Sequence, residues 1–156
     1  MKTAEWLAKL NKKHWKILDL SKAALLVIDM QYYFTDPTSH AFVPSAPFVQ
    51  KNIQKLITRF KKEKRPVIYT FFAVGPKEKD PILNWWGHTV STGSKDAQLT
   101  LTPDATDLVL RKPTYSAFHK TALHDFLQLN AIESVLVTGL LSNLCCETTA
   151  RDAFNH

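Results

Sequence analysis

Four short, continuous hydrophobic runs constrain the fold of this chain more than any other feature. They are AALLVID at 23–29, PVIYTFFAV at 66–74, DLVLRK at 107–112 and SVLVTG at 134–139. An unbroken hydrophobic run, in place of strict alternation with polar residues, is typical of a strand in a parallel sheet that is covered on both faces. We therefore expect these four segments to form parallel strands.

Helical patterns lie between the hydrophobic runs. Residues 46–63 place hydrophobic side chains on one stripe, with lysines elsewhere. Residues 121–129 are expected to begin at Thr121 as the N-cap, with Asn130 next in a left-handed position, and a third helix is expected from Ser142 onward. Strands that alternate with helices predict an α/β fold with an open parallel sheet and helices on both faces.

The length of 156 residues suits one domain, which we assign to residues 1–156. Residues 75–105, rich in Pro, Gly, Ser and Thr, are interpreted as a long functional loop. The start of the chain is expected to form an amphipathic helix with Trp6, Leu7 and Leu10 on one face. Because the chain stops within a helical pattern, we expect it to be truncated, with a C-terminal strand and helix missing.

Composition and charge exclude several classes of protein. No hydrophobic run approaches the roughly 20 residues of a membrane helix, and the Lys-containing start is no secretory signal. The net charge of +6 comes largely from Lys and Arg at 9–16 and 51–65, which we interpret as solvated helix surfaces. A nucleic-acid binder stays a weaker alternative, because no recognised binding module is present. Two adjacent cysteines do not build a disulfide framework, so we expect a cytoplasmic protein.

Three reactive groups follow the ends of predicted strands. Asp29 ends the first strand, Lys112 ends the third, and the pair Cys145 and Cys146 follows the fourth at a helix start. Ligands of open parallel sheets bind beyond the carboxyl ends of the strands, so these groups are expected to converge there. An ammonium group and a helix N-terminus would lower the pKa of the thiol, and the carboxylate would take its proton. Backbone N–H groups in the turn before the cysteines would bind an oxyanion. This chemistry is acyl transfer to water.

Three sequence blocks carry a family resemblance. LLVIDMQYYF at 25–34, KPTYSAF at 112–118 and GLLSNLCCETTARDA at 139–153 resemble, in order and spacing, the signature blocks of the isochorismatase-like cysteine hydrolases, and WG at 86–87 is a further landmark. The resemblance implies a Rossmann-like sheet. Relatives continue with one more strand and helix, which agrees with truncation.

The resemblance also implies roles for single residues. It predicts a catalytic triad of Asp29, Lys112 and Cys145, with Cys146 as a packing residue. The oxyanion hole would use the backbone N–H groups of Leu141 and Cys145, and a cis peptide bond is expected between Leu140 and Leu141. Gln31 is expected among the substrate-binding residues, where a hydrogen bond would shape the site, with a purely structural role as the alternative. Aromatic side chains are expected around the substrate, with Phe34 and Trp86 nearest to it. The other candidates for the pocket wall, for which the core or a subunit contact is the alternative, are Trp85, Tyr115 and Phe118.

The expected activity is metal-independent hydrolysis of a C–N bond in a small amide, ureido or carbamoyl compound. Metal-binding relatives carry His and Asp after the second strand, whereas this chain has TFFAVGPKEKD there and an isolated His88, so we expect no metal and no other cofactor. The alternatives are vinyl-ether hydrolysis, as in isochorismatases, and ligand binding without catalysis. In the isochorismatase alternative Lys77 or Lys79 would hold substrate carboxylates. The expected partners are a small-molecule substrate and further copies of the chain in a homodimer or homotetramer, with no nucleic acid and no membrane.

Overall fold

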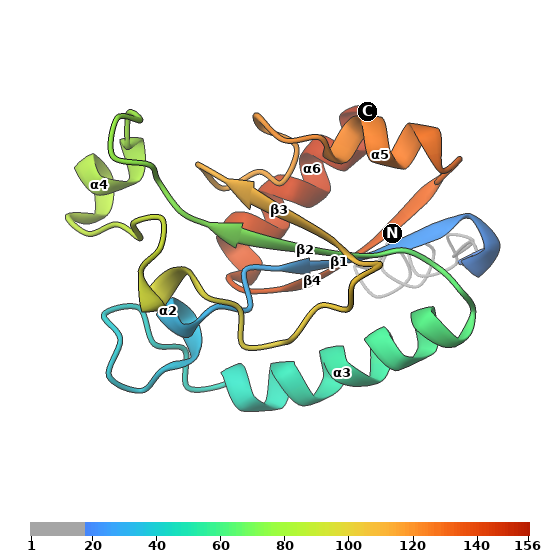
Figure 1. The fold of residues 1–156 in the computed structure, drawn as a ribbon, viewed down its shortest axis with the longest axis horizontal. Helices are drawn as coiled ribbons and strands as arrows, with labels where there is room; N and C mark the ends of the chain where they lie inside the picture. Colours follow the sequence, from blue (N-terminus) through green and yellow to red (C-terminus); the bar gives the residue numbers. More distant parts are fainter. Residues whose placement is uncertain (1–17) are drawn as a thin grey trace, which may run out of the picture.

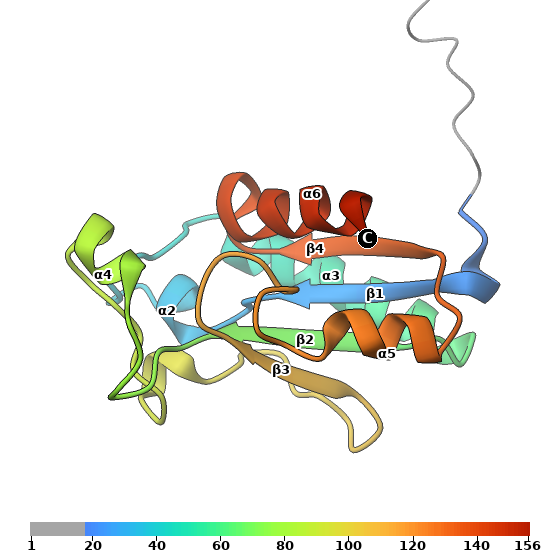
Figure 2. The same ribbon diagram turned by 90° about the horizontal axis from the view of Figure 1, so that it is seen from above.

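A four-stranded parallel sheet forms the centre of the fold. The computed structural model describes residues 18–156, and its strands are β1 (Ala23–Ile28), β2 (Val67–Phe72), β3 (Leu108–Lys112) and β4 (Ser134–Gly139). Their order is β3-β2-β1-β4, and all neighbours are parallel (Figure 2). The predicted strands and the α/β class are confirmed, and three of the four strands are slightly shorter than their hydrophobic runs.

Helices cover both faces of the sheet. Helix α3 (Ala46–Lys62) lies on one face, and α5 (Leu123–Leu129) and α6 (Glu147–Asn155) lie on the other (Figure 1). Strand β1 is fully buried, and its side chains alternate between two hydrophobic clusters, one shared with α3 and one with α5. Each fully buried Leu, Ile or Val contributes about 1.5–3 kcal/mol, so the uniform hydrophobicity of this run stabilises both layers.

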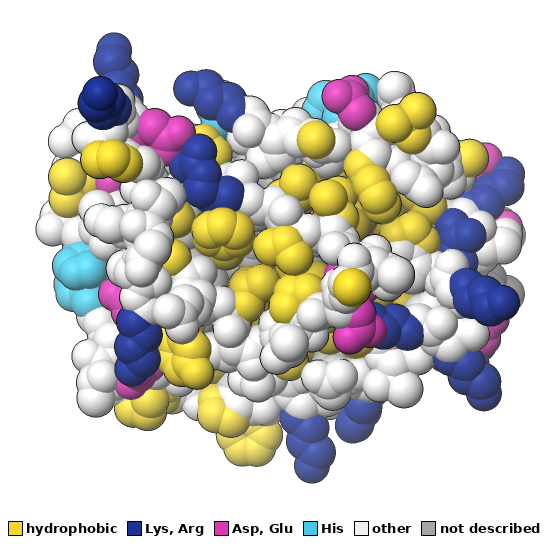
Figure 3. Space-filling view, viewed as in Figure 1, with side chains coloured by type: hydrophobic (Ala, Val, Ile, Leu, Met, Phe, Trp, Pro, Cys, Tyr) yellow, Lys and Arg dark blue, Asp and Glu magenta, His cyan; other side chains and the backbone are white. Residues whose placement is uncertain are grey.

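Lys51, Lys55 and Lys62 of α3 lie on its exposed face, as predicted from their spacing, whereas Lys61 is half-buried. The space-filling view shows the molecule from the side of the edge strand β3 (Figure 3). Hydrophobic side chains gather over the middle of this face, and most Lys and Arg side chains lie nearer its edges. Among residues 18–156, no helix combines the length and hydrophobicity that a membrane-spanning segment requires.

Short helices gather beyond the carboxyl ends of the strands. They are α2 (Tyr32–Thr35), α4 (Pro81–Trp86) and the 3₁₀ turn η2 (Lys95–Ala97), while another 3₁₀ turn, η1 (Leu20–Lys22), precedes β1 (Figure 1). The interpretation of residues 75–105 as a loop is therefore wrong in part. Helix α4 has ordinary start and stop signals, because Asp80 Oδ1 accepts hydrogen bonds from two backbone N–H groups and Gly87 ends the helix at φ 68°.

Two helix boundaries differ from the prediction. Helix α5 begins at Leu123, and the Thr121 hydroxyl accepts a hydrogen bond from the Leu123 N–H at 3.2 Å without being the N-cap residue. The left-handed residue after α5 is Ala131, at φ 50°, and not Asn130. The Asn130 side chain instead donates a hydrogen bond to the Phe126 carbonyl at 2.8 Å, which satisfies the helix end locally.

The predicted third helix starts at Ser142, but its first turn is a wide π turn, η3 (Ser142–Cys146), which leads into α6. The predicted helix around Trp6, Leu7 and Leu10 lies outside the described residues. The single-domain assignment and the missing C-terminal strand and helix stay predictions.

Candidate active site

The strand register brings the three reactive residues to one edge of the sheet. Ile28 pairs with Gly139 of β4, so Asp29 follows β1 at the level where the cysteine turn begins. Phe72, the last residue of β2, pairs with Lys112, the last residue of β3. Three strand ends that are far apart in sequence therefore meet where ligands of parallel sheets bind.

The side chains of Asp29, Lys112 and Cys145 are in direct contact. Lys112 Nζ lies 2.7 Å from Asp29 Oδ2 and 3.3 Å from Cys145 Sγ. It also donates a hydrogen bond to the Thr114 carbonyl at 2.8 Å, so the ammonium group contacts three polar partners. Asp29 and Lys112 are fully buried, and Cys145 is 5% exposed. The structure thus brings together the three residues that the sequence pattern singled out.

Asp29 is held from several sides. Thr70 of β2 donates a hydrogen bond to Oδ1 at 2.8 Å, and the backbone of Asp29 adopts φ 48°, a region that few non-glycine residues occupy. Within residues 18–156, Oδ2 accepts no hydrogen bond of normal geometry, although the Lys112 ammonium lies beside it. This oxygen is therefore placed to accept a proton from the neighbouring thiol.

Burial and charge set the protonation of the lysine and the thiol. Burial by itself lowers the pKa of Lys112, but the negative charge of Asp29 and the contact with Cys145 together raise it above its usual value. The pKa of Cys145 is also raised, first because the thiol is buried and second because Asp29 repels a thiolate, while Lys112 opposes the shift. The expectation of a lowered thiol pKa is therefore wrong, because desolvation outweighs the single cation.

Gly139 lets the cysteine turn approach the end of β1. Its φ is 119°, and an added Cβ atom would lie 1.9 Å from the Ile28 carbonyl oxygen, which no side chain tolerates. The next residue, Leu140, donates its N–H to the same oxygen at 3.0 Å. The peptide bond between Leu140 and Leu141 is cis, as predicted, and the chain then enters the π turn that carries Cys145.

The segment after β3 is fastened to α6. The Ser116 hydroxyl donates to Asp152 Oδ2 at 2.5 Å, and the Ala117 N–H donates to the Thr149 hydroxyl at 3.0 Å. Thr149 is fully buried. Part of the YSAF block thus has a structural role, since it connects the Lys112 segment to the helix that follows Cys145.

A cavity of about 340 Å³ opens next to Cys145. Its walls come from α2 and the segment after it, from the end of β2, from α4, from the segment after β3 and from the cysteine turn. The residues that line it are Tyr33, Phe34, His40, Ala41, Phe42, Val43, Phe72, Ile82, Trp86, Tyr115, Leu141, Leu144 and Cys145. Five of the residues predicted for the site are among them, and Trp86 Nε1 donates a hydrogen bond to the Tyr115 hydroxyl at 2.6 Å across the wall.

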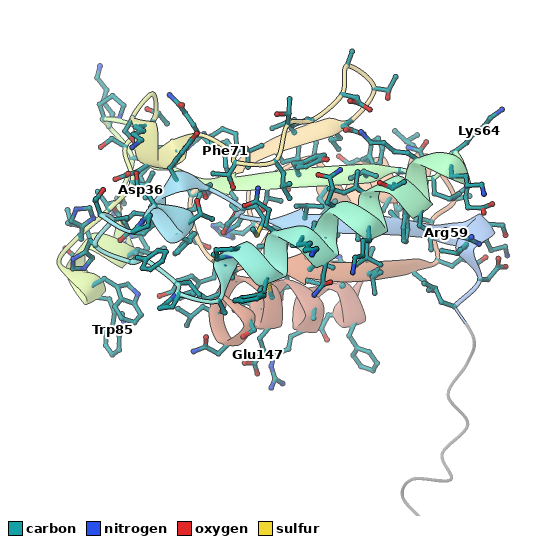
Figure 4. All side chains as sticks on the ribbon, turned by 90° about the horizontal axis from the view of Figure 1, so that it is seen from below. Asp36, Arg59, Lys64, Phe71, Trp85 and Glu147 are labelled. Atoms are coloured by element: carbon teal, nitrogen blue, oxygen red, sulfur yellow. The ribbon has the colours of Figure 1, made fainter. Side chains whose placement is uncertain are left out.

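Two aromatic residues considered for the pocket lie elsewhere. Phe118 packs in the hydrophobic cluster on the α5 side of the sheet, where its ring stacks on His156 at 4.8 Å between centroids. Trp85 is 79% exposed and projects away from the body of the molecule (Figure 4). Phe118 therefore does not line the substrate cavity. Of the two adjacent tryptophans in α4, Trp85 points outward, since neighbouring residues on a helix face different directions.

Gln31 lies behind the site and does not line the cavity. Its amide group donates to the carbonyl of Phe72 at 3.0 Å and to that of Asp96 at 3.2 Å, and its Oε1 accepts the Phe72 N–H at 2.7 Å. The side chain is fully buried. These hydrogen bonds connect the segment after β1 to the end of β2 and favour the structural role of Gln31, while substrate contact by Gln31 has no support from the cavity lining.

We expect Gln31→Leu to lower the free energy of unfolding by about 1–3 kcal/mol, because it leaves the buried N–H and C=O of Phe72 without partners. Urea denaturation followed by circular dichroism measures the change. Thr58→Val is a suitable control, since it removes an exposed side-chain hydrogen bond on α3. Equal stability of Gln31→Leu and the unchanged chain would contradict the assigned role.

Several cavity residues were not predicted. His40 stacks on His88 at 4.8 Å between ring centroids, and the Tyr33 hydroxyl lies 3.4 Å from His88 Nδ1. His88 is thus part of a ring cluster and not isolated. The other unpredicted members are mostly hydrophobic residues of the segments around α2 and α4. No sequence signal separates them from ordinary core residues, because the path of these segments decides which side chains face the cavity.

Among residues 18–156, no three His, Cys, Asp or Glu side chains are grouped as a metal site would require. The expectation of a metal-free site stays a prediction. Lys77 and Lys79, considered as anchors for substrate carboxylates, are exposed and do not line the cavity.

Comparison with known proteins identifies relatives along most of the chain. The family model described as isochorismatase domain matches residues 23–156. A protein named isochorismatase from Bacillus subtilis (strain 168) is 31% identical over 148 residues, which cover 92% of this chain and 47% of the relative. The chain spans about half the length of the first curated relatives it matches.

Solved structures agree with this match. A cysteine hydrolase from Pseudomonas syringae pv. phaseolicola superimposes with a TM-score of 0.84 at 29% identity, covering 91% of this chain and 70% of that one. An N-carbamoylsarcosine amidase from Thermoplasma acidophilum superimposes with a TM-score of 0.79 at 31% identity, covering 86% and 76%. The likeness therefore extends to all four strands of the sheet.

Proposed function

Because this chain belongs to the isochorismatase family, we propose that it acts as a cysteine hydrolase that cleaves the C–N bond of a small amide or carbamoyl compound. One observation carries the proposal: a buried ammonium group lies between a carboxylate and a thiol, at 2.7 Å and 3.3 Å, and the thiol borders a cavity of substrate size. The likeness to an N-carbamoylsarcosine amidase supports the same bond type. The substrate is a small molecule, and assembly into a dimer or tetramer stays a prediction.

In the first half of the reaction, Asp29 takes the proton of the Cys145 thiol while the sulfur attacks the substrate carbonyl carbon. The negative charge that develops on the carbonyl oxygen is bound by the backbone N–H groups of Leu141 and Cys145, both of which belong to cavity-lining residues. Asp29 then passes the proton to the leaving nitrogen. The C–N bond breaks, the amine departs, and a thioester remains on Cys145.

In the second half, water attacks the thioester carbon and Asp29 takes a proton from that water. The C–S bond breaks, the proton returns to the sulfur, and a carboxylic acid or a carbamate leaves. Lys112 keeps its charge throughout, because its raised pKa holds the ammonium form. It stabilises the thiolate that appears only as the reaction proceeds.

We expect the thiol of Cys145 to be protonated in the resting protein. Since burial and Asp29 raise its pKa above the ordinary cysteine value near 8.5, the thiolate fraction is negligible at pH 7 and stays below one half at pH 8.5. The difference in thiolate ultraviolet absorbance between the unchanged chain and Cys145→Ala, followed during a pH titration, measures it. Cys146 contributes little in this range, because burial and the charge of Asp29 raise its pKa to about 12. A thiolate signal already complete at neutral pH would contradict this account.

Vinyl-ether hydrolysis is the second candidate, favoured by the 31% identity to a protein named isochorismatase. That reaction needs a proton donor to carbon and no nucleophilic sulfur, so it would survive the loss of Cys145. A hydrolysis panel of small amides, carbamoyl compounds and isochorismate, each run with Cys145→Ala as the blank, therefore separates the two candidates. Tight binding of a panel member with no turnover would favour a binding protein without catalysis.

A further inference from the structure

The wall of the cavity beside Cys145 is mostly hydrophobic and aromatic, with His40 as its one basic side chain among the described residues. None of the described residues that line it is Lys, Arg, Asp or Glu. Asp29 and Lys112 lie behind the thiol, fully buried and paired with each other. A substrate in the cavity thus meets hydrophobic and aromatic side chains, with polar atoms from only a few of them.

Most of those polar atoms already have partners. The Trp86 indole N–H donates to the Tyr115 hydroxyl at 2.6 Å. The Tyr33 hydroxyl lies 3.4 Å from the His88 ring, which in turn stacks on His40. The wall therefore offers few free donors to a polar substituent.

Two cations near the wall are held in ion pairs, and Lys77 and Lys79 are exposed and do not line the cavity. Lys95 pairs with Asp36 at 2.6 Å, beside the segment that follows α2. Arg111 binds both carboxylate oxygens of Glu78, at 2.7 Å and 2.8 Å, where the chain leads into α4. Neither cation is free to balance a carboxylate inside the cavity.

The cavity is open to solvent on one side, so its volume sets the size of the group that it can enclose and not that of the whole substrate. A volume of about 340 Å³ corresponds to on the order of ten non-hydrogen atoms, if each takes about the 30 Å³ that a water molecule occupies in the liquid. An amide group uses three of these atoms. The remainder is the size of a short branched alkyl group or a single ring.

From these observations, and resting on the amide hydrolysis proposed above, we propose that the substrate is a neutral amide with a compact hydrocarbon acyl group. A carboxylate on the acyl group would lose its hydration without gaining a cation, which is strongly unfavourable. A hydrocarbon group of the same shape would instead gain from burial against the aromatic wall. This preference excludes the charged carbamoyl amino acids and the dicarboxylates as good substrates.

Two probes of equal size test the proposal. 4-Methylpentanamide and succinamate have the same number of non-hydrogen atoms and differ in an isopropyl group against a carboxylate. We expect kcat/KM for 4-methylpentanamide to exceed that for succinamate by at least about 100-fold. Equal values, or a faster reaction of succinamate that depends on Cys145, would overturn the proposal and leave the hydrolase function intact.

A matched pair of variants localises the effect. Ile82 lines the cavity from the first turn of α4 and is half-buried, so Ile82→Lys introduces a cation at the wall. The ammonium group of the new lysine attracts the carboxylate of succinamate, and the long side chain lets this charged end stay near water. We therefore expect the ratio of the two kcat/KM values to shift toward succinamate by at least about 10-fold. Leu83→Lys, on the exposed side of the same helix, is expected to leave the ratio unchanged. An equal shift in both variants would contradict a specific role of the cavity wall.

Binding gives a readout that is independent of turnover. Calorimetric titration of the Cys145→Ala chain is expected to show tighter binding of 4-methylpentanamide than of succinamate by at least about 10-fold. If neither probe nor any other amide is hydrolysed by the unchanged chain, the proposed function fails. Even then, the relative affinity of the two probes in the titration supports or overturns the proposed preference of the cavity for an uncharged acyl group.

Discussion

Replacing Cys145 by alanine is expected to lower amide turnover by at least about 10⁴-fold, because the covalent step has no other nucleophile and the remaining groups only orient the substrate. The thiol borders the cavity and contacts the Lys112 ammonium at 3.3 Å, so its removal leaves the carboxylate and the lysine without a reaction partner. Release of ammonia or amine from the best substrate of the panel measures the effect.

The neighbouring cysteine is the matched control. Cys146 is half-buried, packs against the hydrophobic cluster on the α5 side of the sheet and does not line the cavity. Cys146→Ala is therefore expected to keep turnover within a few-fold of the unchanged chain. Because its thiol is buried and protonated at rest, Cys145 is expected to react only slowly with iodoacetamide at pH 7, as mapped by mass spectrometry, and bound substrate is expected to slow this reaction further. Full turnover by Cys145→Ala would contradict the covalent mechanism.

Lys112→Met is expected to lower the free energy of unfolding by about 3–5 kcal/mol and to abolish turnover. Methionine keeps much of the side-chain volume but removes the charge, so the carboxyl group of Asp29 remains buried with no cation beside it. The cost arises from this unpaired carboxylate, and not from lost packing. Urea denaturation followed by tryptophan fluorescence measures the change, because cavity-lining Trp86 reports on the same region.

The double variant Asp29→Asn with Lys112→Met separates stability from catalysis. Asparagine has the shape of aspartate and tolerates the left-handed backbone at φ 48°, so the substitution removes the charge with little strain. We expect the double variant to regain most of the lost stability, since no buried charge is left unpaired, and to stay inactive. A Lys112→Met chain as stable as the unchanged one would contradict a buried ion pair in this site.

The identity of the strands and their parallel direction could be predicted because the signal is local, whereas their order in the sheet comes from the structure. Each strand is a continuous hydrophobic run, and a run of that kind is stable only with cover on both faces. The convergence of Asp29, Lys112 and the cysteine pair then follows from parallel strands that share one carboxyl edge. The choice between Cys145 and Cys146 came from the family resemblance, and the two different environments of these cysteines agree with it.

The walls of the cavity were harder to predict because they belong to connecting segments. Gln31 and Phe118 lie in blocks that also carry site residues, yet one fills a buried hydrogen-bond position and the other packs on the far face of the sheet. Adjacent residues in such segments point in different directions, as Trp85 and Trp86 do. Direction depends on the path of the backbone, which no short pattern in the sequence determines.

The sequence by itself determined which segments form the sheet and which reactive groups reach its edge, because hydrophobic burial depends on residue type and the carboxyl ends of parallel strands share one edge. Only the tertiary structure decided the protonation of those groups. Lys112 and the thiol of Cys145 both have raised pKa values, since burial, the charge of Asp29 and contacts of a few ångströms compete at this site. Such energies depend on distance and solvent exposure, and these exist only once the chain has folded.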